Sequence, residues 1–279
     1  MKTKVWLTDT TLRDGEQRSG FALNADDKVK LAGLLDAAGY YQIEAGIPAM
    51  GRREKDTICR IMELRKNAKI AVWNRMKMED VAHSCDCRPD VMHLSAPVSD
   101  IMISGLLRKD RRWVKKQLAD CISYAKDKGY EVSVGFQDAS RADIDFLRGL
   151  ISQISALGVN MVRLADTVGI LTPLKARYMA EALARETDIG IAVHTHNDLG
   201  MAAAVAAEAV KGGARFVDTT LFGIGERAGN CDAYTFAQLT EGYFDVAPAM
   251  VTLEKLMREA KGMLVPKESD SGEEASACR

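Results

Sequence analysis

Short apolar segments alternate with longer amphipathic segments along nearly the whole chain. The short segments are rich in β-branched and aliphatic residues, and in the longer ones apolar residues recur at intervals of three and four. This alternation predicts parallel strands that are joined by crossover helices. The predicted strands are Val5–Thr10, Gln42–Gly46, Ile70–Asn74, Val91–Ser95, Glu131–Gly135, Met161–Ala165, Gly190–His194 and Phe216–Leu221.

The segments between these strands carry helix start and stop signals. Asn24 precedes one helix, and Thr172 precedes a proline that can occupy the first helical position. Eight strand–helix units without a break in composition predict an α/β fold of the closed (β/α)8 type, a TIM barrel, over an open doubly wound sheet. Clear amphipathic helices are Asp26–Ala38, Trp113–Lys128, Ile144–Leu157 and Pro173–Glu186.

The 279 residues suit one barrel, which typically needs about 250 residues. We expect a catalytic barrel domain over residues 1–265 that ends in a short helical extension near Ala233–Tyr243. Residues 266–279 are polar and acidic with almost nothing to bury, which predicts a disordered tail.

Charge and composition narrow the class of function. The formal net charge is -1, so no basic surface favours nucleic acid or an anionic membrane. The N-terminus runs directly into a predicted strand and has no signal-peptide pattern. We therefore expect a cytoplasmic protein that binds small molecules, with its six cysteines present as thiols.

Three further features are weak candidates for binding sites. Cys85 and Cys87 form a close pair, but no second pair stands at zinc-finger spacing, so ordinary thiols are expected. Gly223–Gly229 looks superficially like a dinucleotide-binding loop, yet it follows the last predicted strand and no βαβ unit comes after it. His83 and His93 have no partners at ligand spacing, and we expect structural roles for both.

His194 and His196 are two residues apart at the end of the seventh predicted strand. On a strand, both imidazoles point to the same side and can bind one ion. Such a pair alone is more often structural, but Asp14 follows strand one and Asn230 follows strand eight, and these strands neighbour strand seven in a closed barrel. Two imidazoles with oxygen donors and no thiolate predict Mg2+, Mn2+ or a catalytic Zn2+.

Two charged residues near this site can each have one of two roles. Arg13 beside Asp14 forms an ordinary ion pair, or it binds an anionic substrate and stabilises a developing enolate or alkoxide. Glu44 ends an otherwise apolar strand, where an acid must be either paired or functional.

Several of these segments resemble the signature motifs of the DRE-TIM metallolyase family, and the resemblance covers about Lys4 to Leu239. The signature segments are LRDGEQ at 12–17, HTHND at 194–198 and GIGERAGN at 223–230. Within the family, homocitrate synthases of the nitrogen-fixation type are the most similar, on the segments EAGIPAMG at 44–51, LSAPVSD at 94–100, DASRAD at 138–143 and LADTVGIL at 164–171.

The resemblance implies a role for each matching residue. Asp14, His194, His196 and Asn230 would bind the metal, which chelates the 2-oxo group and carboxylate of 2-oxoglutarate. Arg13 and Glu44 are the implied catalytic residues, and Arg13 would stabilise the oxyanion. Arg13, Gln17, Glu44, Ser95 and Thr167 are the implied substrate-binding residues. The implied reaction joins the methyl carbon of acetyl-CoA to the ketone, and thioester hydrolysis then releases homocitrate and CoA.

Two departures from the family pattern bear on partners. Synthases of this family usually continue past the barrel into a region that supplies a histidine or tyrosine to a neighbouring active site, and here a polar tail is expected instead. Gln137 stands where the family has a glutamate, and an amide cannot accept a proton. We therefore expect either a homodimer or a complex with a complementary C-terminal subunit.

Two alternatives stay open from the sequence. One is a lyase or aldolase that cleaves the corresponding bond, as hydroxymethylglutaryl-CoA lyase does; the cysteine-containing loop of that enzyme is not evident here. The other is a noncatalytic barrel, or the barrel subunit of a split synthase. The identities of the oxo acid and of the metal are not fixed by the sequence.

Overall fold

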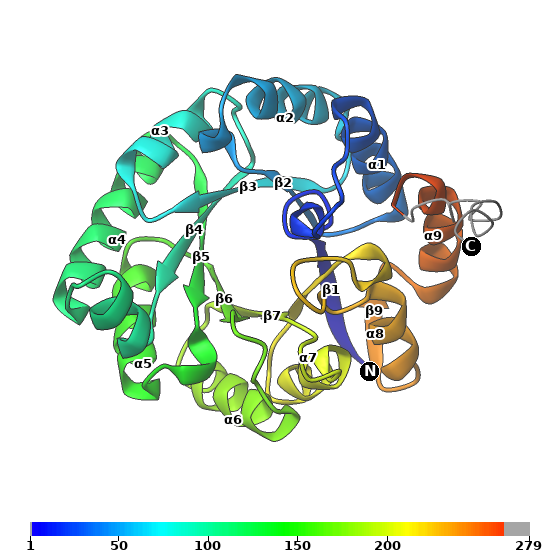
Figure 1. Ribbon diagram of the computed structural model, residues 1–279. Helices are drawn as coiled ribbons and strands as arrows, with labels where there is room; N and C mark the ends of the chain where they lie inside the picture. The colour runs from blue at the N-terminus through cyan, green and yellow to red at the C-terminus, as the bar shows by residue number, and fades with distance from the viewer. Residues whose placement is uncertain (1, 265–279) are drawn as a thin grey trace, which may run out of the picture.

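Eight parallel strands form a closed barrel inside a ring of helices in the computed structural model, which describes residues 2–264 (Figure 1). The strands are β1 (Thr3–Asp9), β2 (Gln42–Gly46), β3 (Lys69–Arg75), β4 (Val91–Pro97), β5 (Glu131–Gln137), β6 (Met161–Asp166), β7 (Gly190–Thr195) and β8 (Phe216–Thr219). All eight strands predicted from the sequence are confirmed, and their ends shift by at most two residues.

β1 closes the barrel because it pairs on both sides. Thr8 is in register with Gln42 of β2 and with Asp218 of β8, and both pairings are parallel. The closed barrel is therefore confirmed, and an open doubly wound sheet is excluded.

The helices pack their apolar faces against the outer surface of the barrel. Asn24 and Thr172 cap two of them as predicted, each accepting a hydrogen bond from the backbone N–H three residues later. The helices are α1 (Ala25–Ala38), α2 (Arg52–Leu64), α3 (Met78–Cys85), α4 (Arg111–Asp127), α5 (Ile144–Ala156), α6 (Pro173–Ala184), α7 (Ala202–Lys211), α8 (Ala233–Leu239) and α9 (Met250–Leu264). None of the helices within residues 2–264 is long and apolar enough to cross a bilayer.

A ninth strand was not predicted. β9 (Phe244–Ala247) pairs in parallel with the first half of β1, whereas β8 pairs with its second half. The expected helical extension is therefore shorter than predicted, ending at Leu239, and β9 and α9 follow it. The predicted tail, residues 266–279, lies outside the described residues.

The barrel interior is unusually polar. Branched aliphatic side chains normally fill the inside of such barrels. Here the strands carry buried polar and charged side chains, which cost free energy unless they are paired. They include Glu44, His93, Ser133, Arg163, His194 and Asp218.

Candidate active site and metal centre

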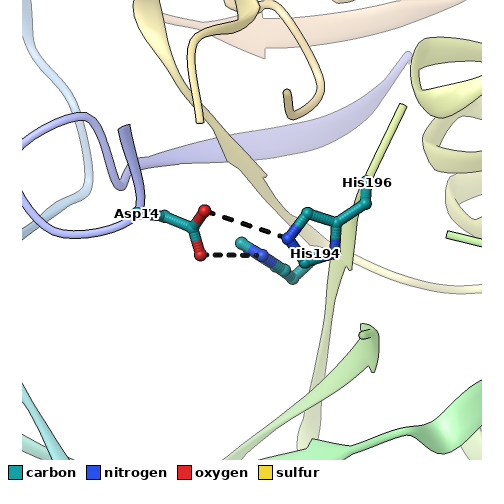
Figure 2. Close-up of side chains that lie close together, drawn as sticks. All are labelled: Asp14, His194 and His196. Atoms are coloured by element: carbon teal, nitrogen blue, oxygen red, sulfur yellow. Dashed lines mark ion pairs between the residues drawn. The ribbon is translucent and has the colours of Figure 1, made fainter. Parts of the chain in front are cut away.

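Asp14, His194 and His196 bring three potential metal-binding groups together at the carboxyl end of the barrel (Figure 2). Asp14 follows β1, His194 lies in β7 and His196 comes directly after β7. His194 Nε2 is 3.4 Å from Asp14 Oδ2, and His196 Nε2 is 3.8 Å from Asp14 Oδ1. All three residues are buried. The two histidines thus face one carboxylate, as their spacing predicted.

Each imidazole is held at its Nδ1 atom. His194 Nδ1 is 3.1 Å from Asp218 Oδ2 in β8, and His196 Nδ1 is 2.9 Å from the backbone carbonyl of Asp166. Because a carbonyl only accepts, His196 carries its proton on Nδ1 and keeps a free lone pair on Nε2. That Nε2 is buried without a hydrogen-bond partner among residues 2–264. Metal-binding histidines are commonly held in this way.

Asn230 adds an amide oxygen to the group. Its Nδ2 donates to Asp14 Oδ1 at 2.9 Å and to the backbone carbonyl of Ile224 at 3.0 Å, which fixes the orientation of the amide. Asn230 Oδ1 is buried and has no partner within the described residues. Gly225 makes room for this amide, since a Cβ there would lie 2.0 Å from Asn230 Nδ2. The four residues therefore fit a divalent cation, which would satisfy both unpaired donor atoms.

Arg13 is held between two carboxylates beside this group. Its Nη1 is 2.6 Å from Asp14 Oδ2, and its Nε is 2.5 Å from Glu44 Oε1. Its guanidinium also lies over the ring of Trp73, 5.9 Å from the ring centroid. The side chain is mostly buried but faces the cavity, so its position is fixed before any ligand binds.

Arg163 of β6 extends this charge network inside the barrel. Its Nη1 is 2.8 Å from Glu44 Oε2, and its Nε is 2.6 Å from Asp218 Oδ2. Both contacts are ion pairs without the alignment of a hydrogen bond. Asp218 also contacts His194, which in turn contacts Asp14. The contacts therefore form a closed ring of charged side chains: Arg13, Asp14, His194, Asp218, Arg163 and Glu44.

The ring fixes the protonation of its members. Burial alone would raise the pKa of Glu44, but Arg13 and Arg163 outweigh it and hold that pKa far below its usual value. Burial lowers the pKa of His194, yet hydrogen bonds to Asp14 and Asp218 raise it to about 9. A bound metal would replace the His194 proton at Nε2, so metal binding would release a proton.

A cavity of about 240 Å³ opens beside the histidines, and its lining includes four of the predicted substrate-binding residues, Arg13, Gln17, Ser95 and Thr167. Thr167 is anchored there because its Oγ1 accepts a hydrogen bond of 2.8 Å from the backbone N–H of Asp138. Glu44 is not part of the lining; it is fully buried and holds the two arginines.

Sequence reasoning missed several residues of this cavity. Arg163, Trp73 and Glu226 line it and were not singled out, and His93, which was expected to be structural, lines it as well. A signal existed for Arg163, because a charged residue inside an apolar strand must be paired or functional, as was argued for Glu44. Trp73 and His93 carried no such signal, since aromatic residues are common in strands.

A second cavity of about 430 Å³ adjoins the first and shares Arg13, Gln17 and Ile47 with it. Its apolar lining includes Phe21 and Leu23. Its charged lining includes Lys28, which is almost fully buried and pairs with Glu16 and Glu54.

Comparisons with known proteins show which proteins this chain is similar to. The HMGL-like family matches residues 4–260. Homocitrate synthase subunit alpha of Clostridium pasteurianum is 47% identical over 84% of this chain and 87% of that protein. Homocitrate synthase of Frankia alni is 45% identical and 2-isopropylmalate synthase 2 of Caldanaerobacter subterraneus subsp. tengcongensis 44% identical, each over 81% of this chain. The chain spans only 64% and 59%, respectively, of the length of these two relatives.

Solved structures are similar in fold. Hydroxymethylglutaryl-CoA lyase from Pseudomonas aeruginosa superimposes with a TM-score of 0.82 over 96% of this chain and 95% of that chain, at 19% sequence identity. The carboxyl transferase domain of Rhizobium etli pyruvate carboxylase gives a TM-score of 0.77 over 99% of this chain and 50% of that chain, at 17% identity. At such identities the likeness concerns the fold alone.

Proposed function

The chain belongs to the HMGL-like family, and on that premise we propose that it is the barrel subunit of a metal-dependent homocitrate synthase. The proposed reaction condenses acetyl-CoA with 2-oxoglutarate and then hydrolyses the thioester. The observation that carries this proposal is the buried group of Asp14, His194, His196 and Asn230, with two unsatisfied ligand atoms beside a cavity.

The four residues would hold a divalent ion through two imidazole nitrogens, a carboxylate oxygen and an amide oxygen. When bound, the ion supplies a Lewis acid that polarises the ketone of the oxo acid. Asp14 and the two histidines are fixed by their neighbours before a ligand arrives, so little reorganisation is needed on binding.

Arg13 would stabilise the negative charge that develops on the ketone oxygen during carbon–carbon bond formation. Its guanidinium faces the cavity while Glu44 and Asp14 fix it from behind. Fixed donors aimed at a developing charge are usually the largest single contribution to catalysis. Glu44 stays ionised and paired, so its role is to position Arg13 rather than to exchange a proton.

Acetyl-CoA would approach through the cavity of about 430 Å³. This cavity meets the first one at Arg13 and Gln17, which would place the thioester methyl group next to the ketone. The methyl group must lose a proton before its carbon attacks, and water then cleaves the thioester to give a carboxylate and the thiol of CoA.

The methyl proton needs an acceptor, and Gln137 stands where the family pattern has a glutamate. Gln137 lines the cavity but is an amide. The relative matched over most of its own length is called a subunit alpha, whereas the two longer synthases reach well beyond the matched part. We therefore propose that a second polypeptide completes the active site and supplies the proton acceptor.

The test is thiol release from acetyl-CoA with a panel of 2-oxo acids, with and without Mn2+ or Mg2+, for this chain alone and together with a candidate partner polypeptide. The proposal predicts release that requires both 2-oxoglutarate and the metal, and none with His196→Ala. No release in any combination would overturn it. Cleavage of hydroxymethylglutaryl-CoA in its place would favour a lyase.

A further inference from the structure

Two cysteine thiols from different elements lie together on the outer ring of helices. Cys59 belongs to α2, and Cys87 comes just after α3, the next helix around the ring (Figure 1). Both are free thiols; Cys87 is 3% exposed and Cys59 is half-buried. Neither residue lines the cavity of about 240 Å³ or the cavity of about 430 Å³, so the proposed chemistry does not use them.

Each of the two sulfurs contacts a backbone oxygen that adjoins the other cysteine. Cys87 Sγ is 3.9 Å from the carbonyl oxygen of Lys55. In an α-helix this carbonyl accepts from the N–H four residues later, which in α2 is that of Cys59. Cys59 Sγ is 3.9 Å from the carbonyl oxygen of Asp86, and the carbon of that carbonyl is bonded to the nitrogen of Cys87. The two side chains therefore share one small space between α2 and the turn after α3.

The titration of Cys87 reflects this proximity. Burial raises the pKa of Cys87 to about 12, and a hydrogen bond with the Cys59 thiol adds to the rise. The ammonium group of Lys55 opposes it, held nearby by the Asp86 carboxylate at 2.7 Å and by His83 Nδ1 at 3.0 Å. Cys87 thus keeps its proton at neutral pH, and the more exposed Cys59 is the sulfur that a reagent in solution meets first.

Cys85 is closer to Cys87 in sequence but has a different contact. Its Sγ is 3.5 Å from the carbonyl oxygen of Val81, one turn earlier in α3. Cys85 and Cys87 form the close pair in the sequence, but in the fold the thiol that contacts Cys87 is that of Cys59.

We infer that Cys59 and Cys87 form a dithiol site that small-molecule disulfides, such as glutathione disulfide, convert to an internal disulfide. This inference goes beyond the proposed function and does not depend on it. A disulfide requires Cβ atoms about 3.5 to 4.5 Å apart. Since each sulfur reaches the backbone beside the other cysteine, the two side chains overlap along their length, as such a short separation requires.

The conversion is a two-step thiol–disulfide exchange that needs no other oxidant. The Cys59 thiolate attacks one sulfur of the small disulfide, and the other sulfur leaves as a thiol with the proton of Cys59. The Cys87 sulfur then attacks the Cys59 sulfur of this mixed disulfide, and the second small thiol leaves with the proton of Cys87. Two protein thiols are oxidised, and one small disulfide is reduced to two thiols.

The disulfide would restrain a helix that borders the larger cavity. α2 contributes Arg53, Glu54 and Thr57 to the lining of the cavity of about 430 Å³. The cross-link would also restrict the unfolded chain by closing the loop between residues 59 and 87. The oxidised protein is therefore expected to have a Tm several degrees higher than the reduced protein.

Incubation of the full-length protein with glutathione disulfide, followed by acid quenching, tryptic digestion and mass spectrometry, tests the inference. Trypsin releases Cys59 within residues 56–60, and it releases Cys85 and Cys87 together within residues 78–108. A disulfide between Cys59 and Cys87 links these two peptides, whereas one between Cys85 and Cys87 stays within the second peptide. The variants are Cys59→Ser and Cys87→Ala, with Cys85→Ser as the matched control.

The inference predicts linked peptides in the wild type and in Cys85→Ser, and none in the other two variants. The rise in Tm should occur only in the two proteins that form the link, and dithiothreitol should reverse it. The Tm of each reduced variant shows whether that variant is folded. Unlinked peptides in the oxidised wild type, a link that is lost in Cys85→Ser, or a Cys59 that stays a glutathione adduct would overturn the inference.

Discussion

At the scale of single residues, the site depends on how each metal-facing side chain is held from behind. His194 is held by the Asp218 carboxylate and His196 by the Asp166 backbone carbonyl, so the two have unequal supports. A side-chain support can be removed by substitution, whereas a backbone support cannot. Asp218 is therefore the residue at which this arrangement can be tested without touching a proposed metal ligand.

Asp218→Asn is expected to weaken metal binding by roughly 10- to 100-fold, the usual effect of losing the carboxylate behind a metal-binding histidine. The amide keeps the size of the side chain but loses the charge that faces His194 Nδ1 and Arg163 Nε. Titration of Mn2+ by calorimetry measures the change.

Asp36→Asn is the matched control for that titration. Asp36 is also buried, but it accepts hydrogen bonds from the backbone N–H groups of Lys66, Asn67 and Ala68, and none of these residues lines the cavity. Its substitution should lower stability and leave the affinity for Mn2+ unchanged. Equal Mn2+ affinities in wild type and Asp218→Asn would show that the Asp218 carboxylate does not support metal binding by His194.

Individual residues differ in how far the sequence could predict them. The pair His194 and His196 could be predicted, because strand geometry puts both side chains on one face. Asp218 and Arg163 could not be assigned partners, since their contacts cross from β8 and β6 to other strands and depend on the side-chain register inside the barrel. The orientation of His93 depends on Ser133 and on a missing side chain at Gly135, which only the packing reveals.

At the scale of elements, the strand ends carry buried charged side chains, and burying a charge costs free energy. Asp9, the last residue of β1, is fully buried and accepts hydrogen bonds from the backbone N–H and the hydroxyl of Thr11. Burial is the largest cause that raises its pKa to about 7, and these hydrogen bonds only partly offset it.

This shift predicts how stability depends on pH. In the unfolded chain Asp9 loses its proton near pH 4, but in the folded chain it keeps the proton until about pH 7. Between these two pH values, deprotonation of Asp9 therefore stabilises the unfolded state relative to the folded state. The contribution of Asp9 to the free energy of unfolding should therefore fall as pH rises from about 4 to 7, and level off above.

Asp9→Asn removes this dependence. The free energy of unfolding of the variant, relative to wild type, should rise with pH between about 4 and 7 by on the order of 4 kcal/mol at most. Urea unfolding at several pH values measures it, with Asp26→Asn on an exposed side chain as the control. A difference between Asp9→Asn and wild type that stays constant with pH would contradict the assignment.

The elements themselves were largely predictable. The eight strands follow from alternating apolar runs, and Asn24 and Thr172 mark helix starts correctly. β9 was missed because it is a four-residue edge strand whose partner, β1, lies more than 230 residues earlier in the chain, and no local pattern encodes such a pairing.

At the scale of the whole molecule, the proposed metal site joins segments that follow the first strand and the last two strands of the barrel. Asp14 follows β1, whereas the other three residues come from β7 and from the segment after β8. An ion bound by all four would bind the folded chain and not the unfolded one, so it should stabilise the closed barrel.

Mn2+ at about 100 times its dissociation constant is expected to add about 2.7 kcal/mol to the free energy of unfolding. Thermal unfolding with Mn2+ and with a chelator measures this as a rise in Tm of several degrees. His196→Ala should show no rise, because it removes a proposed ligand. The same rise in wild type and His196→Ala would place the stabilising ion elsewhere.

The most direct test of the central claim is the location of Mn2+ by anomalous diffraction from crystals grown with Mn2+ and 2-oxoglutarate. One strong peak is expected within bonding distance of Asp14, His194, His196 and Asn230, with the oxo acid bound beside it. A peak outside this group, or an oxo acid bound away from the ion, would contradict the proposed metal site.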